Sequence, residues 1–154
     1  MSFRLFEQLS DRTLATIVGG LLPAIFYGAS SVFAKASANA GMSAGGHLIF
    51  TGIAVCVVGV VLSVVMPNGG ASPSAISASL MFGTLWALGS GAMVVALFRY
   101  NAVLAKLAPL YNSNTLLAVF LGLVVFSEWQ QVDLIKLTLG TIAIVIGGIL
   151  VSLA

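Results

Sequence analysis

Residues 47–66 read HLIFTGIAVCVVGVVLSVVM, an apolar run that contains no Asp, Glu, Lys or Arg. A helix needs about 20 predominantly apolar residues to cross the hydrocarbon core of a bilayer. The run is continuous and lacks the period-two alternation that is typical of strands in membrane β-barrels. It therefore predicts a helix that spans a membrane.

Similar apolar runs occur before and after this stretch, at 14–36, 76–97, 103–126 and 135–153. Short polar or glycine-rich connections separate the runs, such as PNGGASP at 67–73 and RYN at 99–101. No connection is long enough to hold a folded soluble domain. The sequence thus predicts an all-α, polytopic membrane protein whose residues 1–154 form a single domain of five transmembrane helices.

The composition excludes several classes of soluble protein. Hydrophobic residues make up 60% of the 154-residue chain and charged residues only 6%, whereas a soluble domain carries about 25% charged residues. The net charge of +2 includes no basic run that would bind nucleic acid. Because Cys56 is the single cysteine and no metal, phosphate-loop or nucleophile motif is present, we expect no metal, no cofactor and no enzymatic activity.

Residues 1–13 form a separate segment ahead of the first predicted span. Phe3, Leu5 and Phe6 alternate there with charged residues such as Arg4 and Glu7. This pattern favours a short helix that lies in the membrane interface. A cleaved signal peptide is the alternative, because a charged start also precedes the apolar run.

Lys and Arg side chains are divided evenly between the two sides of the predicted bundle. The N-terminal face would hold Arg4, Arg12 and Lys136. The opposite face would hold Lys35, Arg99 and Lys106. Orientation follows an excess of Lys and Arg on the cytoplasmic side, so an even split predicts insertion both ways and antiparallel pairing of two copies. The alternative is a single orientation, in which Lys35 or Lys106 lies within a span and does not count.

Polar side chains inside the predicted spans are costly in a bilayer and therefore mark candidate sites. In the first span Tyr27, Ser31 and Lys35 follow Pro23 at intervals of four, which places them on one helix face. We predict that this stripe lines a substrate pathway, with Lys35 as its fixed charge. The alternative is that Lys35 extends to the headgroups and Tyr27 only packs.

The third and fourth spans carry further candidate substrate-binding side chains, which are Trp86, Ser90, Tyr111, Asn112 and Asn114. In the fourth span they follow Pro109, which leaves a backbone carbonyl unpaired and is tolerated where the helix faces a cavity or other helices. The Trp86 ring could stack on an organic substrate. The alternative for all of them is packing or hydrogen bonding that only joins the helices.

Glycines mark a candidate contact surface on the fifth span. Gly140 and Gly147 lie two turns apart on one face, and Gly148 widens the groove between them. Such small residues let helix backbones approach closely in a membrane. We predict a dimer interface here, and the alternative is packing inside one protomer.

Three stretches resemble a known family of carriers. FYGASSVFAKASANAGMS at 26–43 resembles the first helix and following loop of EamA-type carriers in the drug/metabolite transporter superfamily. LAPLYNSNTLLAVFLGLVVFSEW at 107–129 resembles their fourth helix, and LTLGTIAIVIGGILVSLA at 137–154 their closing glycine-rich helix. The glycine spacing of the last stretch also resembles the dimerisation helix of the small multidrug resistance proteins.

The resemblance implies a function for the chain. Typical EamA-type carriers have ten helices in two inverted repeats, and this chain has the length of one repeat. It implies a secondary transporter of a small polar or amphipathic metabolite or drug, which works by alternating access as an antiparallel homodimer in the cytoplasmic (inner) membrane of a bacterium or archaeon. The alternative is a non-transporting membrane subunit or scaffold that assembles with a partner chain.

Overall fold

The computed structural model describes residues 13–66 and 70–154, and every regular element in this part of the chain is a helix. The helical segments that are long and apolar enough to cross a membrane are Thr13–Asn39, Ala44–Val65, Pro73–Arg99, Leu104–Val125 and Leu134–Leu153. They confirm the predicted all-α fold of five spans, with ends within three residues of the predicted ones. The protein is an integral membrane protein. Residues 1–12 of the predicted interfacial segment lie outside the described residues.

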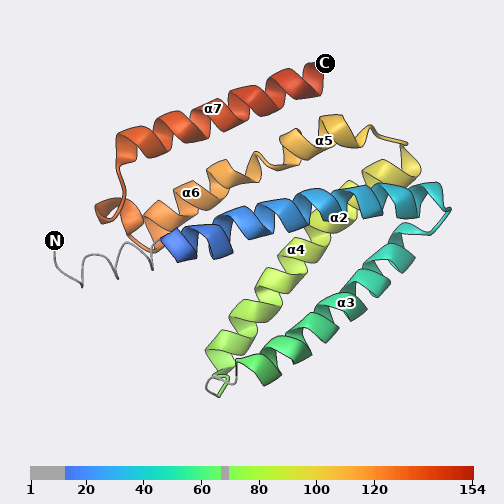
Figure 1. Cartoon of the computed structure of the whole chain (residues 1–154), viewed down its shortest axis with the longest axis horizontal. Helices are drawn as coiled ribbons and strands as arrows, with labels where there is room; N and C mark the ends of the chain where they lie inside the picture. Colours follow the sequence, from blue (N-terminus) through green and yellow to red (C-terminus); the bar gives the residue numbers. More distant parts are fainter. Residues whose placement is uncertain (1–12, 67–69) are drawn as a thin grey trace.

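The element boundaries divide two of the spans (Figure 1). In chain order the elements are η1 (Ile17–Leu21), α2 (Leu22–Asn39), α3 (Ala44–Val65), α4 (Pro73–Arg99), α5 (Leu104–Tyr111), α6 (Asn114–Val125), η2 (Glu128–Gln130) and α7 (Leu134–Leu153). The first span joins η1 to α2, and the fourth joins α5 to α6.

One turn of π-helix, η1, widens the first span just before Pro23. A proline inside a helix has no amide hydrogen, and its ring crowds the carbonyl four residues earlier, here that of Gly19. The chain relieves this conflict with the wider turn. The stripe of polar residues begins directly after it.

Serine caps fix the starts of the two helices that form a hairpin. The Ser43 hydroxyl accepts a hydrogen bond from the Gly46 amide at 3.0 Å, and the Ser72 hydroxyl accepts one from the Ala75 amide at 3.2 Å. Pro73 occupies the first turn of α4, where a missing amide hydrogen costs nothing. These caps start α3 and α4 three residues before the predicted starts at 47 and 76.

The fourth span is interrupted, which the sequence analysis did not anticipate. α5 ends at Tyr111 and α6 begins at Asn114. At the junction the Ser113 amide donates to the Leu110 carbonyl and not to that of Pro109 four residues earlier, so the last turn of α5 is tightened. Pro109 also has no amide hydrogen, so the Ala105 carbonyl lacks its helical donor. The carbonyls of Ala105 and Pro109 therefore lack their regular helical bonds.

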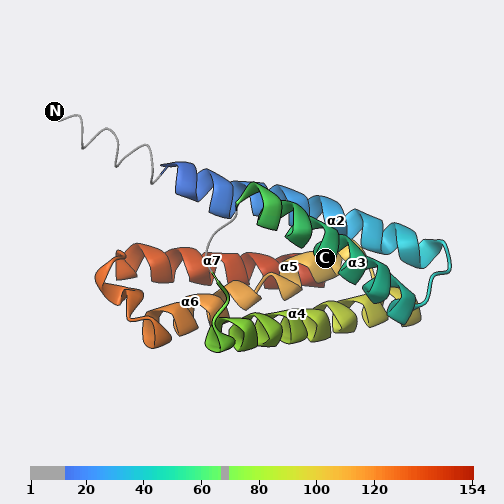
Figure 2. The same ribbon diagram turned by 90° about the horizontal axis from the view of Figure 1, so that it is seen from below.

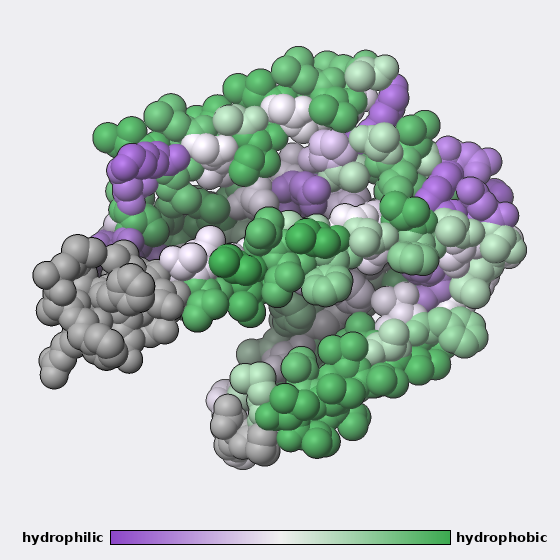
Figure 3. All heavy atoms as spheres, viewed as in Figure 1, coloured by the Kyte–Doolittle hydropathy of each residue, from purple (hydrophilic) through white to green (hydrophobic). Residues whose placement is uncertain are grey.

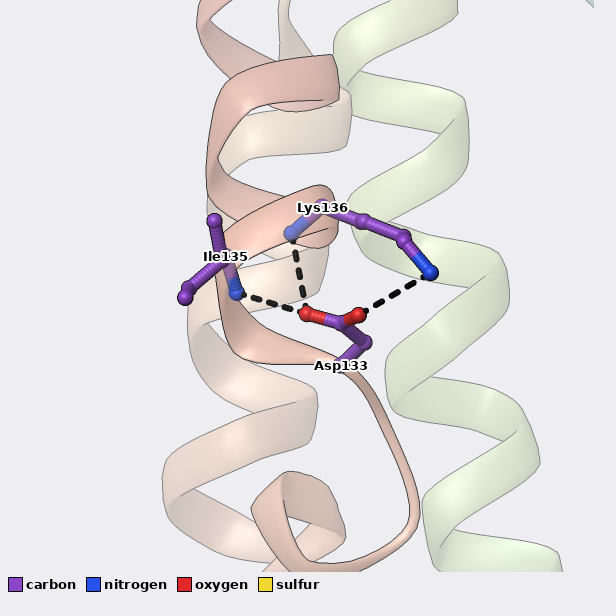
Figure 4. Close-up of polar contacts among 3 residues, drawn as sticks. All are labelled: Asp133, Ile135 and Lys136. Carbon is purple, nitrogen blue, oxygen red and sulfur yellow. Dashed lines mark hydrogen bonds and ion pairs between the residues drawn. The ribbon is translucent and has the colours of Figure 1, made fainter.

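The carboxylate of Asp133 caps the start of α7 (Figure 4). Its Oδ1 accepts hydrogen bonds from the amides of Ile135 at 3.1 Å and Lys136 at 3.2 Å, and its Oδ2 lies 3.2 Å from Lys136 Nζ. The Lys136 backbone bond, then the Lys136 side chain and the Ile135 amide, hold the pKa of Asp133 below its ordinary value. The charged form of Asp133 is thus the one that stabilises the start of the last span.

We expect Asp133→Ala to lower the thermal stability of the detergent-solubilised protein, because α7 loses its cap. Asp133→Asn keeps a capping oxygen and is the matched control, with a smaller loss. Since the folded pKa is lowered, the contribution of Asp133 is present above its unfolded pKa and is lost as pH falls through the folded pKa. Thermal unfolding followed across acidic pH measures this, and an Asp133→Ala curve that keeps the wild-type pH dependence would contradict it.

α2 lies at the centre of the arrangement. It contacts α3, α4 and α5, while α3 packs on α4, and α7 packs on α5 and α6. Figure 1 shows the α3–α4 hairpin on one side of α2 and α7 on the other. In the turned view, α2 lies at one level and α4 and α6 at another, with α7 between them, while α3 slopes from the level of α4 to that of α2 (Figure 2).

The interior formed by these contacts is small. Within the described residues the buried side chains are Ser31, Ala34, Val94, Leu97 and Thr141. Most other large apolar side chains are exposed, and Figure 3 shows a largely hydrophobic surface with hydrophilic atoms toward its ends and a small hydrophilic group near its middle. Such a surface suits lipid or a second membrane-embedded chain, and it does not suit water.

Candidate functional site

A cavity of about 430 Å³ lies between α2 and α5. Its lining residues come from α2 (Ala24, Tyr27, Gly28 and Ser31), from α5 (Leu104, Ala105, Ala108 and Tyr111) and from the α5–α6 junction (Asn112). The i, i+4 spacing on both helices turns one face of each toward the other. The predicted stripe of the first span and the predicted cluster of the fourth therefore meet at one site.

Ser31 and Tyr111 join the two walls of the cavity. Ser31 is 8% exposed, and its hydroxyl donates to the Tyr27 carbonyl at 2.9 Å. The Ser31 and Tyr111 hydroxyl oxygens lie 2.8 Å apart. Since a serine has only one hydroxyl proton, Tyr111 is the donor of this second bond. The Tyr111 oxygen keeps its acceptor capacity for a ligand.

Further polar atoms in the lining have no partner within the described residues. The Asn112 side chain and the Tyr27 hydroxyl make no hydrogen bond there, and the Tyr27 side chain is 67% exposed. The Asn112 amide offers both donors and an acceptor. The Ala105 carbonyl, released by Pro109, belongs to a residue of the same lining. Together these groups can bind a ligand through neutral hydrogen bonds.

No charged side chain lines the cavity. Lys35 lies one turn beyond Ser31, where it is half-buried and donates to the Ala102 carbonyl at 3.3 Å. The structure thus places Lys35 at the end of the bundle and not in the cavity wall. A cavity of this kind favours an uncharged ligand, because burying a lone charge without a partner is costly.

Three other predicted binding residues lie outside the lining. Trp86 is 42% exposed on α4 and Ser90 is half-buried on the same helix. Asn114 is exposed at the start of α6. None of them belongs to the cavity between α2 and α5. Their predicted contact with substrate stays a prediction.

Small residues complete the cavity, and the sequence analysis did not single them out. Ala24 and Gly28 on α2 and Ala105 and Ala108 on α5 contribute to the lining. A methyl group added at Gly28 would meet no atom within 4 Å. In the sequence, Ala24 and Gly28 are four residues apart, and Ala105 and Ala108 are three apart. This spacing places them on the helix faces that also carry Tyr27 and Tyr111, and it is the sequence signal that could have identified them.

A larger hollow of about 550 Å³ lies along α3 and differs in chemistry. Its lining, Ile49, Gly52, Ile53, Cys56, Val57, Val60 and Val61, comes from that one helix and offers no hydrogen-bonding side chain other than a thiol. α3 has no buried residue among those described. The α3 surface therefore resembles a lipid-facing helix side, and the smaller cavity is the candidate site.

Gly148 on α7 packs against α5, the helix that forms one wall of the cavity, within the same chain. It is buried, and a Cβ built there would lie 2.9 Å from the Pro109 carbonyl oxygen. Gly148 therefore permits close packing of α7 on α5 within one protomer, while its predicted part in a dimer groove stays a prediction. Gly140 and Gly147 are exposed with no atom near their Cβ positions, and their place in a dimer interface stays a prediction.

We expect Gly148→Ala to destabilise the protein by about 1–3 kcal/mol, because overpacking against a backbone carbonyl forces α7 away from α5. Gly147→Ala is the matched control at the preceding position. It should leave monomer stability unchanged or slightly higher, since alanine favours helix. Thermal unfolding of monomeric protein in mild detergent measures both. Equal stability of the two variants would show that α7 and α5 are not in close contact.

The fold and the cavity define a class: an integral membrane protein of five apolar helices with a neutral, hydrogen-bonding cavity between two of them. The residues described contain no cluster of His, Cys, Asp or Glu that could hold a metal ion. Comparison of the chain with protein-family models, curated proteins and solved structures gave no match. The cavity and the charge distribution are therefore the basis for assigning a function.

Proposed function

We propose that this protein is a secondary transporter that moves a small polar or amphipathic metabolite or drug across the membrane by alternating access. The observation that carries the proposal is the cavity of about 430 Å³ between α2 and α5, in which Tyr27, Ser31, Tyr111 and Asn112 meet. Small-molecule sites are commonly of this size, mostly apolar, with a few placed polar groups. An enzymatic role is not part of the proposal, because no nucleophile–base pair lies in this lining.

Irregular backbone in both walls supports movement around this cavity. η1 precedes the α2 wall, and the α5–α6 junction ends the α5 wall at Asn112. Interrupted membrane helices are a common feature of transporter binding sites, where freed backbone groups contact substrate and the segments move. In the proposed cycle α5 pivots about this junction, and the Ser31–Tyr111 bond breaks to admit the substrate.

The proposed working unit is an antiparallel homodimer that resembles the two inverted repeats of an EamA-type carrier. The even split of Lys and Arg, three on each predicted face, supports insertion in both orientations. The small buried interior leaves most apolar surface free for a partner or lipid. The membrane we propose is the cytoplasmic membrane of a bacterium or archaeon, because that family resemblance points there.

The test is uptake of a panel of neutral and amphipathic compounds by proteoliposomes that contain the full chain, with and without a pH gradient. Empty liposomes correct for passive leakage. For any compound transported, Asn112→Ala should reduce the rate far more than it reduces protein yield. Asn39→Ala, at an exposed asparagine that ends α2 outside the cavity, is the matched control, and its rate should stay near that of the wild type.

The alternative function is a non-transporting subunit or scaffold, and it gives a different result. In that case no compound crosses the membrane faster than in empty liposomes. Asn112→Ala would then lower stability or partner binding without a transport phenotype, since the polar groups would only join helices at about 0.6 kcal/mol per hydrogen bond.

A further inference from the structure

We propose that the end of the helix bundle opposite the N-terminal face carries a docking site for the phosphate group of an anionic lipid. Lys35, Arg99 and Lys106 form the site, and we call them the cationic cluster. This proposal is independent of transport, because it concerns the end of the bundle and not the cavity.

A hydrogen bond places Lys35 beside the connection that Arg99 and Lys106 flank in the sequence. Lys35 Nζ donates to the Ala102 carbonyl at 3.3 Å. Ala102 lies in the α4–α5 connection, three residues after Arg99 and four before Lys106. Arg99 and Lys106 are exposed, and Lys35 is half-buried. The cations thus surround one short connection, whose tight path requires a left-handed residue at Asn101 (φ +50°).

Nothing in this part of the chain neutralises the cationic cluster. The sequence contains no Asp or Glu between Asp11 and Glu128. Within the described residues, Glu128 and Asp133 both lie in the α6–α7 connection, at the other end of the spans, and Asp133 already pairs with Lys136 at 3.2 Å. Figure 3 shows hydrophilic atoms grouped at the end where α2 runs into α3 and α4 into α5. That end carries an uncompensated positive charge, which attracts phosphate.

The surroundings of the cationic cluster favour a lipid over a soluble anion. Tyr100 is 75% exposed and Val103 57% exposed, next to Arg99 and within the same connection. An aromatic ring at the headgroup level and an apolar side chain beside it can contact the glycerol region and the start of an acyl chain. Basic groups at a span end are also the usual recognition element for anionic headgroups. A lipid satisfies the charged and the apolar part of this surface together.

The experiment is native mass spectrometry of the full chain in mild detergent, with phosphatidylglycerol and phosphatidylcholine of identical acyl chains in competition. We expect preferential retention of phosphatidylglycerol. Arg99→Gln should weaken this preference about fivefold, and the triple change Lys35→Gln, Arg99→Gln and Lys106→Gln should remove it. Lys136→Gln is the matched control, because it removes a cation that Asp133 already neutralises.

Further measurements separate charge from folding and lipid from free anion. Lys106→Arg keeps the charge and should keep the preference, and circular dichroism should show that every variant remains helical. Excess inorganic phosphate should fail to displace phosphatidylglycerol. Equal retention of the two lipids by the wild type, a preference that survives the triple change, or an equal loss in Lys136→Gln would overturn the proposal. Displacement by phosphate would overturn the lipid docking site in favour of a soluble anion site.

Discussion

Gly28→Leu is expected to abolish transport while leaving the protein folded. The new side chain would enter the cavity of about 430 Å³ between Tyr27 and Ser31. A Cβ at this position meets no atom within 4 Å, so the helix itself accepts the change. Leucine also favours helix more than glycine, by roughly 0.5–1 kcal/mol. The loss of activity should therefore arise from exclusion of the substrate and not from unfolding.

Gly59→Leu is the matched control for this substitution. Gly59 lies on the exposed surface of α3, and a Cβ there also meets no atom within 4 Å. Transport rates in proteoliposomes, normalised to the amount of folded protein, compare the two variants. If Gly28→Leu transports as well as Gly59→Leu does, the substrate does not pass between α2 and α5.

Two added lysines are expected to fix the orientation of the chain and thereby inactivate it. Placed in the connection at 67–73, they would make the Lys and Arg count 5 against 3 in favour of the N-terminal face, from an initial 3 against 3. Placed after Ala154, they would give 3 against 5. Because the proposed dimer is antiparallel, each variant alone should be inactive, and co-expression of the two should restore activity.

Cysteine labelling from outside intact cells measures the orientation directly. A single cysteine in the 67–73 connection, with Cys56 replaced, should label in about half of the wild-type molecules, as the even charge split predicts. The control is a chain with two glutamines added at the same place instead of the two lysines, and this variant should stay active. Labelling of nearly all or nearly none of the wild-type molecules would show that the chain inserts one way.

The spans could be predicted because each must carry enough apolar residues to cross a bilayer, and this requirement is visible in one sequence. The apolar runs placed the starts of α3 and α4 three residues late, because the capping serines Ser43 and Ser72 begin each helix ahead of its apolar stretch. The break between α5 and α6 was less visible. Pro109 signals a weakened helix, but whether the chain kinks or stops depends on the packing of α7 on α5 through Gly148.

The candidate site was predicted in part. The stripe with Tyr27 and Ser31 and the cluster with Tyr111 and Asn112 do meet, because each lies on one face of its helix. The predicted contribution of Trp86 required α4 to face the same cavity. The α4 helix carries apolar side chains on nearly every side, so sequence periodicity does not fix which side of α4 turns toward α2. Gly147 and Gly148 are adjacent, and only the three-dimensional packing distinguishes them.

Solvent access to the cavity is the most direct test of the central claim that α2 and α5 enclose a substrate path. Ala108→Cys, in a chain with Cys56→Ala, places one thiol in the cavity lining. Val57→Cys in the same background places one on the exposed apolar surface of α3. A charged, membrane-impermeant methanethiosulfonate reagent should react with the cysteine at position 108, because water enters the cavity, and not with that at position 57. If position 108 is as unreactive as position 57 from both sides of the membrane, the polar groups lie in a dry bundle and the transport account is wrong.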